Sequence, residues 1–216
     1  TTRRFTCPYH AWTYDIDGGL VAAPHMDKTD CFTREELSLA AVRCEVFQGW
    51  IYVTLAPDIP PVAEQLAELT PLIDRYNQQH YVTIFSEEHV WDTNWKCLTE
   101  NFMESYHLPV AHRGTVGAHY AVEENTFDER GAFDAFTCQF FTKSDGAPVG
   151  RAHADNTSLE GAWRHTSVMP TIFPSHMYVL APDHLWYLSL QPDGPARTRI
   201  RYGAAIAPEK LAGETD

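Results

Sequence analysis

The pattern of hydrophobic and polar positions divides the chain into a short β-rich segment and a longer mixed segment. Over residues 5–55, aromatic and β-branched residues predict short strands, with a turn at Asp17-Gly18-Gly19 and a strand over residues 48–53. A group of prolines then ends this pattern, at Pro57, Pro60 and Pro61. The sequence therefore predicts a boundary near residue 58.

The longer segment combines helical and strand-like patterns. Apolar positions recur at helical spacing over residues 62–76, and β-branched and aromatic residues predict a strand over residues 81–91. Asp92-Thr93-Asn94 offers an N-cap for a helix that is expected to run to about Leu108 and to end at Pro109. Further strands are predicted over residues 133–143, 177–180, 185–191 and 197–205. The predicted fold class is α+β, with a mainly antiparallel sheet and a few helices.

Composition and charge exclude several classes of partner. The chain has 216 residues, 44% of them hydrophobic, which is enough for one or two domains with real cores. Its formal net charge of −13 repels phosphate backbones and anionic lipids, so no nucleic acid and no membrane partner is expected. Residues 165–182 are the longest stretch without Asp, Glu, Lys or Arg. Prolines and histidines interrupt this stretch, so it is not predicted to span a membrane.

The cysteines and the first residue indicate where the protein works and how much of it is present. There are five cysteines without a Cys-x-x-Cys pair, a number and spacing that fit a reducing cytoplasm better than a disulfide framework. The chain begins with Thr1 rather than Met and shows no signal-peptide pattern. We therefore expect an internal piece of a longer cytoplasmic protein.

Two groups of residues could carry chemistry, and the shorter lies near the N-terminus. Cys7-Pro8-Tyr9-His10 places a thiolate and an imidazole three residues apart on a predicted turn, close enough for both to bind one metal. Alone, this motif fits equally a structural cysteine beside a surface histidine.

The second group lies on the helix predicted after Asn94. At about 100° per residue, Glu100, Glu104 and His107 fall within roughly 60° of one another. Apolar residues take the opposite face, at Trp95, Leu98, Phe102 and Tyr106. An ordinary amphipathic helix with a solvated polar face explains this arrangement as well as a binding site does.

Pro109, which lies between two histidines, favours a binding site over an ordinary amphipathic helix. On an unbroken helix His107 and His112 would point about 140° apart, but proline redirects the chain and lets both imidazoles face one point. Two histidines and one carboxylate are the typical ligands of non-haem Fe(II) with open positions for oxygen. The segment is therefore a candidate iron site.

The spacing of this segment resembles a known family. Asn94-Trp95-Lys96-x-x-x-Glu100-Asn101-Phe102-x-Glu104-x-Tyr106-His107-x-x-x-x-His112 is similar to the mononuclear iron motif of Rieske non-haem iron oxygenase α subunits, the aromatic-ring-hydroxylating dioxygenase family. Cys7-Pro8-Tyr9-His10-Ala11-Trp12 is similar to the second half of that family's [2Fe-2S] signature and lies on the expected N-terminal side. The resemblance covers nearly the whole chain.

The resemblance implies two domains, both incomplete. Residues 1–57 would be the C-terminal part of a β-rich Rieske [2Fe-2S] domain. Residues 58–216 would be the catalytic mononuclear-iron domain, an antiparallel-sheet helix-grip fold of the Bet v 1-like or START-like type, incomplete at its C-terminus.

The resemblance also implies a role for each site residue. Cys7 would bind one iron of the cluster and His10 the other, and the remaining Cys-x-His pair lies upstream in the family and is not found here. His107 and His112 would bind the mononuclear Fe(II), and Glu104 would be the acid that links an iron-bound histidine to a cluster-bound histidine of the neighbouring subunit. The third iron ligand stays unknown and is expected beyond Asp216.

The activity implied by the resemblance is oxygenation. O₂ and electrons from NAD(P)H, relayed through the cluster, would hydroxylate or N-demethylate a small organic substrate, as in the catabolism of aromatic compounds. The implied partners are a flavin-containing reductase, with or without a ferredoxin, and the implied assembly is a homotrimer.

The substrate class stays open. Glu104 and the residues between the two histidines are more similar to the choline, betaine and carnitine oxygenases than to the arene dioxygenases. A quaternary ammonium group would need aromatic side chains around it, whereas a planar aromatic acid would need an arginine. The candidate arginines are Arg164, Arg197, Arg199 and Arg201, and the other histidines are interpreted as surface or structural residues: His25, His80, His89, His119, His153, His165, His176 and His184.

Two alternatives from other classes remain. The first is a zinc hydrolase in which His107, His112 and a carboxylate hold a metal-bound water. The second is a non-catalytic ligand-binding domain of helix-grip type, in which replacing His107 would leave the iron content unchanged.

Overall fold

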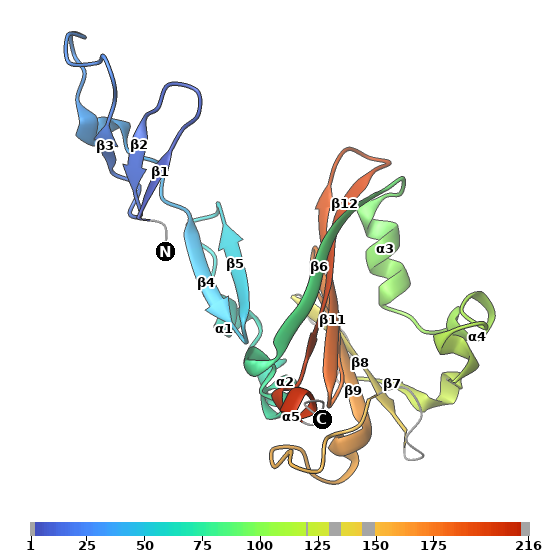
Figure 1. The fold of residues 1–216 in the computed structure, drawn as a ribbon. Coiled ribbons are helices and arrows are strands. Elements are labelled where there is room, and N and C mark those ends of the chain that lie inside the picture. The colour runs from blue at the N-terminus through green and yellow to red at the C-terminus, as the bar shows by residue number, and fades with distance from the viewer. Residues whose placement is uncertain (1–2, 120, 130–134, 144–149, 213–216) are drawn as a thin grey trace. The chain divides into compact units, whose positions relative to one another are not determined.

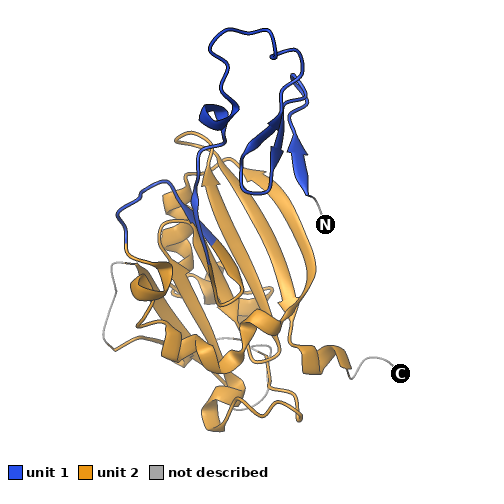
Figure 2. Cartoon of the chain, turned by 90° about the vertical axis from the view of Figure 1, so that its left-hand side faces the viewer, with its two compact units in different colours: residues 1–45, 52–59 blue, residues 46–51, 60–216 orange. Residues whose placement is uncertain are grey.

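The computed structural model describes residues 3–119, 121–129, 135–143 and 150–212 (Figure 1). The chain forms two compact units, which Figure 2 distinguishes by colour. The first comprises Thr1–Glu45 and Tyr52–Ile59, and the second Val46–Ile51 and Pro60–Asp216. The main division therefore lies close to the expected boundary near residue 58. The segment Val46–Ile51, which is the tip of a hairpin described below, belongs to the second unit. The exact domain limits of 1–57 and 58–216 stay a prediction.

The first unit is built from short antiparallel strands. Strands β1 (Arg4–Thr6), β2 (Thr13–Asp15) and β3 (Leu20–Ala22) form a sheet in that order. The predicted turn is present between β2 and β3, where Asp15 Oδ1 accepts hydrogen bonds from the backbone N–H groups of Asp17 and Gly19 at 3.0 and 2.8 Å. Gly18 adopts a φ of +87°, a conformation that glycine reaches without a steric penalty.

A hairpin follows, formed by β4 (Arg43–Phe47) and β5 (Trp50–Thr54). The strand predicted over residues 48–53 begins two residues later than expected. Gln48 and Gly49 both have positive φ, 52° and 85°, and form the turn instead. Two consecutive residues with positive φ are typical of the tight turns that match the twist of a hairpin.

The second unit contains an antiparallel sheet of seven strands among the described residues, in the order β6-β12-β11-β10-β9-β8-β7. It confirms the predicted fold class. The strands are β6 (Val82–Trp91), β7 (Asn125–Phe127), β8 (Phe136–Thr142), β9 (Thr166–Ile172), β10 (His176–Leu180), β11 (His184–Pro192) and β12 (Thr198–Ile206).

Strand β9 was not among the predicted strands, because Pro170 lies in its middle and proline within an apolar run argues against a central strand. In the structure, β9 pairs with β8 on one side and β10 on the other. Its register with β10 passes from Thr171 directly to Val168, so Pro170 lies where this ladder is interrupted. A proline without an N–H group is tolerated at such a position.

The helices of the second unit are shorter than predicted. The helical pattern over residues 62–76 divides into α1 (Val62–Gln65), α2 (Thr70–Ile73) and a 3₁₀ turn at Asp74–Tyr76. Pro71 lies in the first turn of α2, where its missing N–H costs no hydrogen bond. The side chains expected inside are nevertheless buried, namely Leu66, Leu69, Ile73 and Tyr76. The other 3₁₀ turns of this unit are Gln78–His80, Val116–Ala118, Val122–Glu124 and Gly161–His165, and α5 (Pro208–Ala212) follows the last strand, whereas the 3₁₀ turn at Arg34–Leu37 belongs to the first unit.

The helix that begins after Asn94 also ends early. Asn94 is its N-cap, as predicted, and its Oδ1 accepts a hydrogen bond from the Lys96 N–H at 2.9 Å. This helix, α3 (Trp95–Phe102), stops six residues before the expected end, and a separate helix, α4 (Leu108–Ala111), follows. Pro109 therefore lies in the first turn of α4 and does not terminate α3.

Helix α3 lies along one face of the seven-stranded sheet (Figure 1). Phe102 joins a buried cluster with Met177, Leu190 and Ile200 from the central strands. Because burying a large apolar side chain contributes about 1.5–3 kcal/mol, this cluster fixes α3 on the sheet. No helix within the described ranges is both long and apolar enough to cross a bilayer.

His176 makes the stability of the second unit dependent on pH. Its ring packs against the rings of Trp50 and Tyr178, with centroids at 4.5 and 5.1 Å, and its Nε2 is shielded from solvent although part of the residue stays accessible. Burial lowers the pKa of His176 to about 3. In the unfolded chain the imidazole takes up a proton near pH 6.5, so the unfolded state binds more protons below that pH.

We therefore expect the free energy of unfolding to fall as the pH is lowered from about 6.5 toward 3. Urea titrations of the protein and of His176→Phe between pH 7.5 and 5 would measure this dependence. The variant should lose the part of the slope that His176 contributes, whatever its stability at neutral pH. Equal slopes for the two proteins would show that His176 does not titrate in this window.

Candidate functional site

A cavity of about 580 Å³ lies between α3, the segment that follows it and the face of the sheet. Most of its lining is apolar or aromatic. The described lining residues are His89, Trp91, Leu98, Asn101, Phe102, Glu104, His107, Leu108, His112, Val116, Phe141, Ser167, Met169, Val179, His184, Trp186, Leu188, Ile200 and Tyr202. A pocket of this size, with a few polar groups among apolar ones, is typical of a site for a small organic ligand.

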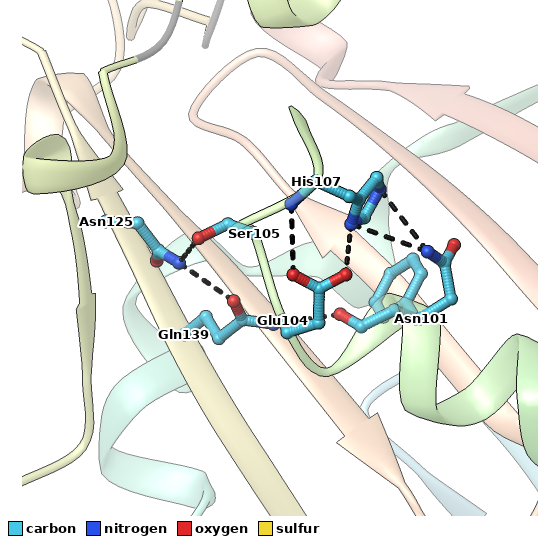
Figure 3. A network of polar contacts seen from close by, with 7 residues as sticks. Asn101, Glu104, Ser105, His107, Asn125 and Gln139 are labelled. Carbon is cyan, nitrogen blue, oxygen red and sulfur yellow. Dashed lines mark hydrogen bonds and ion pairs between the residues drawn. The ribbon is translucent and has the colours of Figure 1, made fainter. Parts of the chain in front are cut away.

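Glu104 and His107 lie in the short connection between α3 and α4 (Figure 3). A Glu104 carboxylate oxygen contacts Nδ1 of His107, and the other accepts the backbone N–H of His107 at 3.1 Å. A carboxylate on Nδ1 fixes the orientation of an imidazole and leaves Nε2 free for another partner. Asn101, near the end of α3, places its amide nitrogen 3.4 Å from both ring nitrogens of His107.

His112 lies at the other end of α4 from His107. The two residues flank this single turn of helix, and their ring centroids are 5.2 Å apart with an interplanar angle of 63°. The structure thus brings the two imidazoles together at the cavity, as the position of proline suggested, but through a helix that begins at Leu108. The expected helical face of Glu100, Glu104 and His107 does not exist, because α3 ends before the last two. Tyr106, expected on the apolar face, is exposed.

A buried glutamine holds this segment on the sheet (Figure 3). Gln139 on β8 donates through Nε2 to the carbonyl of Phe102 at 2.8 Å and accepts through Oε1 from Asn125 at 2.9 Å. Asn125 also contacts the hydroxyl of Ser105. The carbonyl of Phe102 belongs to the last turn of α3 and would otherwise lack a helical partner. This role could not be predicted from the sequence, because a single glutamine within a strand has no characteristic spacing.

The residues present fit a metal centre in part. Two imidazoles line one cavity, and a carboxylate engages Nδ1 of one of them, an arrangement that suits a divalent first-row metal. Within the part of the chain that the structure describes, no group of three or more His, Cys, Asp or Glu side chains is arranged as a metal site. The described residues therefore supply two ligands and not a complete set.

Cys7 and His10 lie on one exposed turn of the first unit. The turn is closed by hydrogen bonds from the Ala11 N–H to the Cys7 carbonyl at 2.9 Å and from the Cys7 N–H to the Trp12 carbonyl at 2.8 Å. Both side chains are exposed, and the ring of His10 lies 3.8 Å from that of Tyr9. An open turn that presents a thiol and an imidazole fits the half-set of cluster ligands predicted from the sequence.

The four candidate arginines lie elsewhere. Arg164 donates to backbone carbonyls of its own loop, Arg197 pairs with Asp193 at 2.8 Å, and Arg201 pairs with Glu88. Arg199 is exposed on β12. None of the four is among the described lining residues of the cavity.

Comparison with known families and proteins agrees with this architecture. The family model described as "Ring hydroxylating alpha subunit (catalytic domain)" matches residues 73–216, and the model described as "Rieske [2Fe-2S] domain" matches residues 1–33. The carnitine monooxygenase oxygenase subunit of Acinetobacter pittii is 33% identical over 114 residues, which cover 50% of this chain and 30% of that protein. The glycine betaine monooxygenase oxygenase subunit of Pseudomonas aeruginosa is 30% identical over 109 residues, which cover 50% and 25%.

Solved structures share the fold. The quaternary ammonium Rieske monooxygenase CntA in complex with L-carnitine superposes with a TM-score of 0.75 at 20% identity, over 95% of this chain and 52% of that one. Naphthalene 1,2-dioxygenase from Rhodococcus sp. gives a TM-score of 0.76 at 20% identity, over 100% and 57%. The chain thus spans about half the length of these proteins. Because the catalytic-domain model covers most of its residues, the chain belongs to the family of ring-hydroxylating oxygenase α subunits.

Proposed function

We propose that this chain is part of an oxygenase that uses O₂ to oxidise a small organic substrate. The observation that carries the proposal is the pair of imidazoles, His107 and His112, at an apolar cavity, with the Glu104 carboxylate held against one of them. Membership of the α-subunit family supports the same activity.

His107 and His112 would hold a mononuclear Fe(II), and Cys7 and His10 would provide half of the ligands of a Rieske [2Fe-2S] cluster. Bound there, the iron would supply the binding and activation of O₂, fed by single electrons through the cluster. The chain's own contribution is placement. Glu104 contacts Nδ1 of His107 and so orients its ring, and the apolar lining keeps water away from the substrate.

The electrons would come from NAD(P)H through a flavin-containing reductase, with or without a ferredoxin. Glu104 would also link an iron-bound histidine to a cluster-bound histidine of a neighbouring subunit, which requires a homo-oligomer and fits a homotrimer. A cytoplasmic location agrees with the five cysteines and the absence of a Cys-x-x-Cys pair. Residues 1–57 and 58–216 would be the parts of the two domains concerned.

The cavity favours a substrate with an apolar or N-methylated body. Aromatic side chains of Trp91, Phe141, Trp186 and Tyr202 line it, and aromatic faces attract a quaternary ammonium group. The described lining contains no arginine or lysine to pair with a carboxylate. Monooxygenation or N-demethylation is the reaction that fits, and relatives named carnitine and glycine betaine monooxygenase subunits support it.

Metal analysis combined with oxygen uptake tests the proposal. The full-length protein, purified anaerobically, should contain iron in excess of its acid-labile sulfide and little zinc. With NAD(P)H and a reductase, it should consume O₂ only when a substrate is present. Zinc at the two-histidine site together with O₂-independent hydrolysis would overturn the proposal in favour of a hydrolase.

A further inference from the structure

Asp183 and His184 form a hydrogen-bonded pair at the cavity wall. Nδ1 of His184 lies 2.7 Å from Oδ1 of Asp183, and the His184 side chain is among the cavity-lining residues. His184 is the first residue of β11, and residues 184, 186 and 188 alternate toward the cavity along that strand. From the sequence, His184 is interpreted as a surface or structural residue, and its position at the cavity wall opens a further role for it.

The turn that carries the pair is held from three sides. The Ala181 N–H donates to the His184 carbonyl at 2.8 Å, and the Ala207 N–H donates to the Asp183 carbonyl at 2.9 Å. The hydroxyl of Tyr81 donates to the Ala181 carbonyl at 3.0 Å. These contacts fix both residues, so little freedom remains to be lost when a ligand binds.

Gly150 brings a further backbone segment against the carboxylate. A Cβ at this position would lie 2.3 Å from Asp183 Oδ1, and Gly150 adopts a φ of +87°, so only glycine allows this approach. The neighbouring Arg151 backbone donates a hydrogen bond to Asp183. Burial raises the pKa of the Asp183 carboxyl, but the hydrogen bonds from His184 and Arg151 outweigh it and hold that pKa below its usual range.

An ionised Asp183 determines which nitrogen of His184 carries the proton. A carboxylate only accepts hydrogen bonds, so Nδ1 of a neutral His184 must be the N–H donor. Nε2 then bears a lone pair. A neutral His184 can therefore accept a hydrogen bond at the cavity and cannot donate one there.

We propose that His184, oriented by Asp183, is a substrate-binding residue that accepts a hydrogen bond from an O–H or N–H group of the substrate. The ligand class is an otherwise apolar molecule with one such donor. This deepens the proposed function and rests on it for the identification of the cavity as the substrate site. Asp183 acts through His184 and is a positioning residue.

Indole and benzofuran form a matched pair of probes, because they share a shape but one has an N–H donor where the other has an oxygen. Isothermal titration calorimetry on the metal-loaded full-length protein, without O₂ or reductant, would give both affinities. We expect the ratio of indole to benzofuran affinity to be about fivefold higher in the wild type than in His184→Phe, because one hydrogen bond contributes about 1 kcal/mol.

Asp183→Asn supplies the second arm. Its amide can donate to Nδ1 and leave the proton on Nε2, so the affinity ratio should fall to or below that of His184→Phe. His153→Phe is the matched control, because His153 also pairs with an aspartate, Asp155, but is not among the described lining residues of the cavity. Its ratio should equal that of the wild type.

The outcomes separate this inference from the proposed function. An equal ratio in the wild type and both variants would overturn the role of His184, even if the enzyme consumes O₂. A ratio that changes as expected in a protein without oxygenase activity would support the role of His184 and overturn the proposed function. Thermal unfolding would show that the variants compared are folded.

Discussion

Replacing His112 with alanine should remove most of the mononuclear iron and abolish substrate-dependent O₂ uptake. His112 and His107 are the two imidazoles that flank α4 at the cavity, and the described residues contain no group of three or more His, Cys, Asp or Glu side chains arranged as another metal site. Because loss of a residue that only orients a ligand already weakens metal binding about 10–100-fold, loss of a ligand should cost at least as much. Iron and acid-labile sulfide, measured together, report the two metal groups separately.

His119→Ala is the matched control for this experiment. His119 is exposed, follows His112 by seven residues and does not line the cavity. The control should keep both metal groups, and His112→Ala should keep the sulfide of its cluster. Unchanged iron in His112→Ala would favour the non-catalytic ligand-binding alternative.

Replacing Glu104 with glutamine should slow turnover about 10–100-fold while leaving the cluster intact. The carboxylate holds His107 at two points, its Nδ1 and its backbone N–H, and glutamine has neither the charge nor two acceptor oxygens. Steady-state rates and iron content of the purified full-length protein would measure the effect, and the visible spectrum of the cluster would show that it is unchanged.

Two further variants make this result specific. Glu104→Asp keeps the charge on a shorter side chain and should recover part of the rate. Glu100→Gln changes an exposed glutamate on α3, four residues earlier and outside the cavity, and should have wild-type turnover. If Glu104→Gln also retained the full rate, neither orientation of His107 nor electron transfer through Glu104 would be needed.

Most of the sheet could be predicted from sequence, but β7, which is three residues long, and β9 were not predicted. Strands β6, β11 and β12 begin within one residue of the expected starts, since aromatic and β-branched residues are frequent in the segments that form them. Strand β9 was not predicted because Pro170 lies in its middle. Only the register with β10 shows that pairing does not need the N–H group that proline lacks. Such information depends on tertiary pairing.

The candidate site was predictable in its residues and not in its local structure. The spacing of Glu104, His107 and His112 identified the segment, and the structure places all three at one cavity. The early end of α3 was missed, because helical spacing continues beyond Phe102, while the donor that satisfies the Phe102 carbonyl is Gln139 on a strand distant in sequence. The pairing of Asp183 with His184 was missed because adjacent residues in a turn carry no periodic signal.

The anchoring of the two-histidine segment by Gln139 limits how the site could be transplanted. Helix α4 comprises only Leu108–Ala111, and helices this short do not persist in water on their own. Residues 94–112 alone would carry both imidazoles and their carboxylate, but not the amide that fixes Phe102 or the Asn125 side chain that contacts Ser105. A designer who wishes to graft this site onto another scaffold must therefore copy part of β8 and β7 along with the motif.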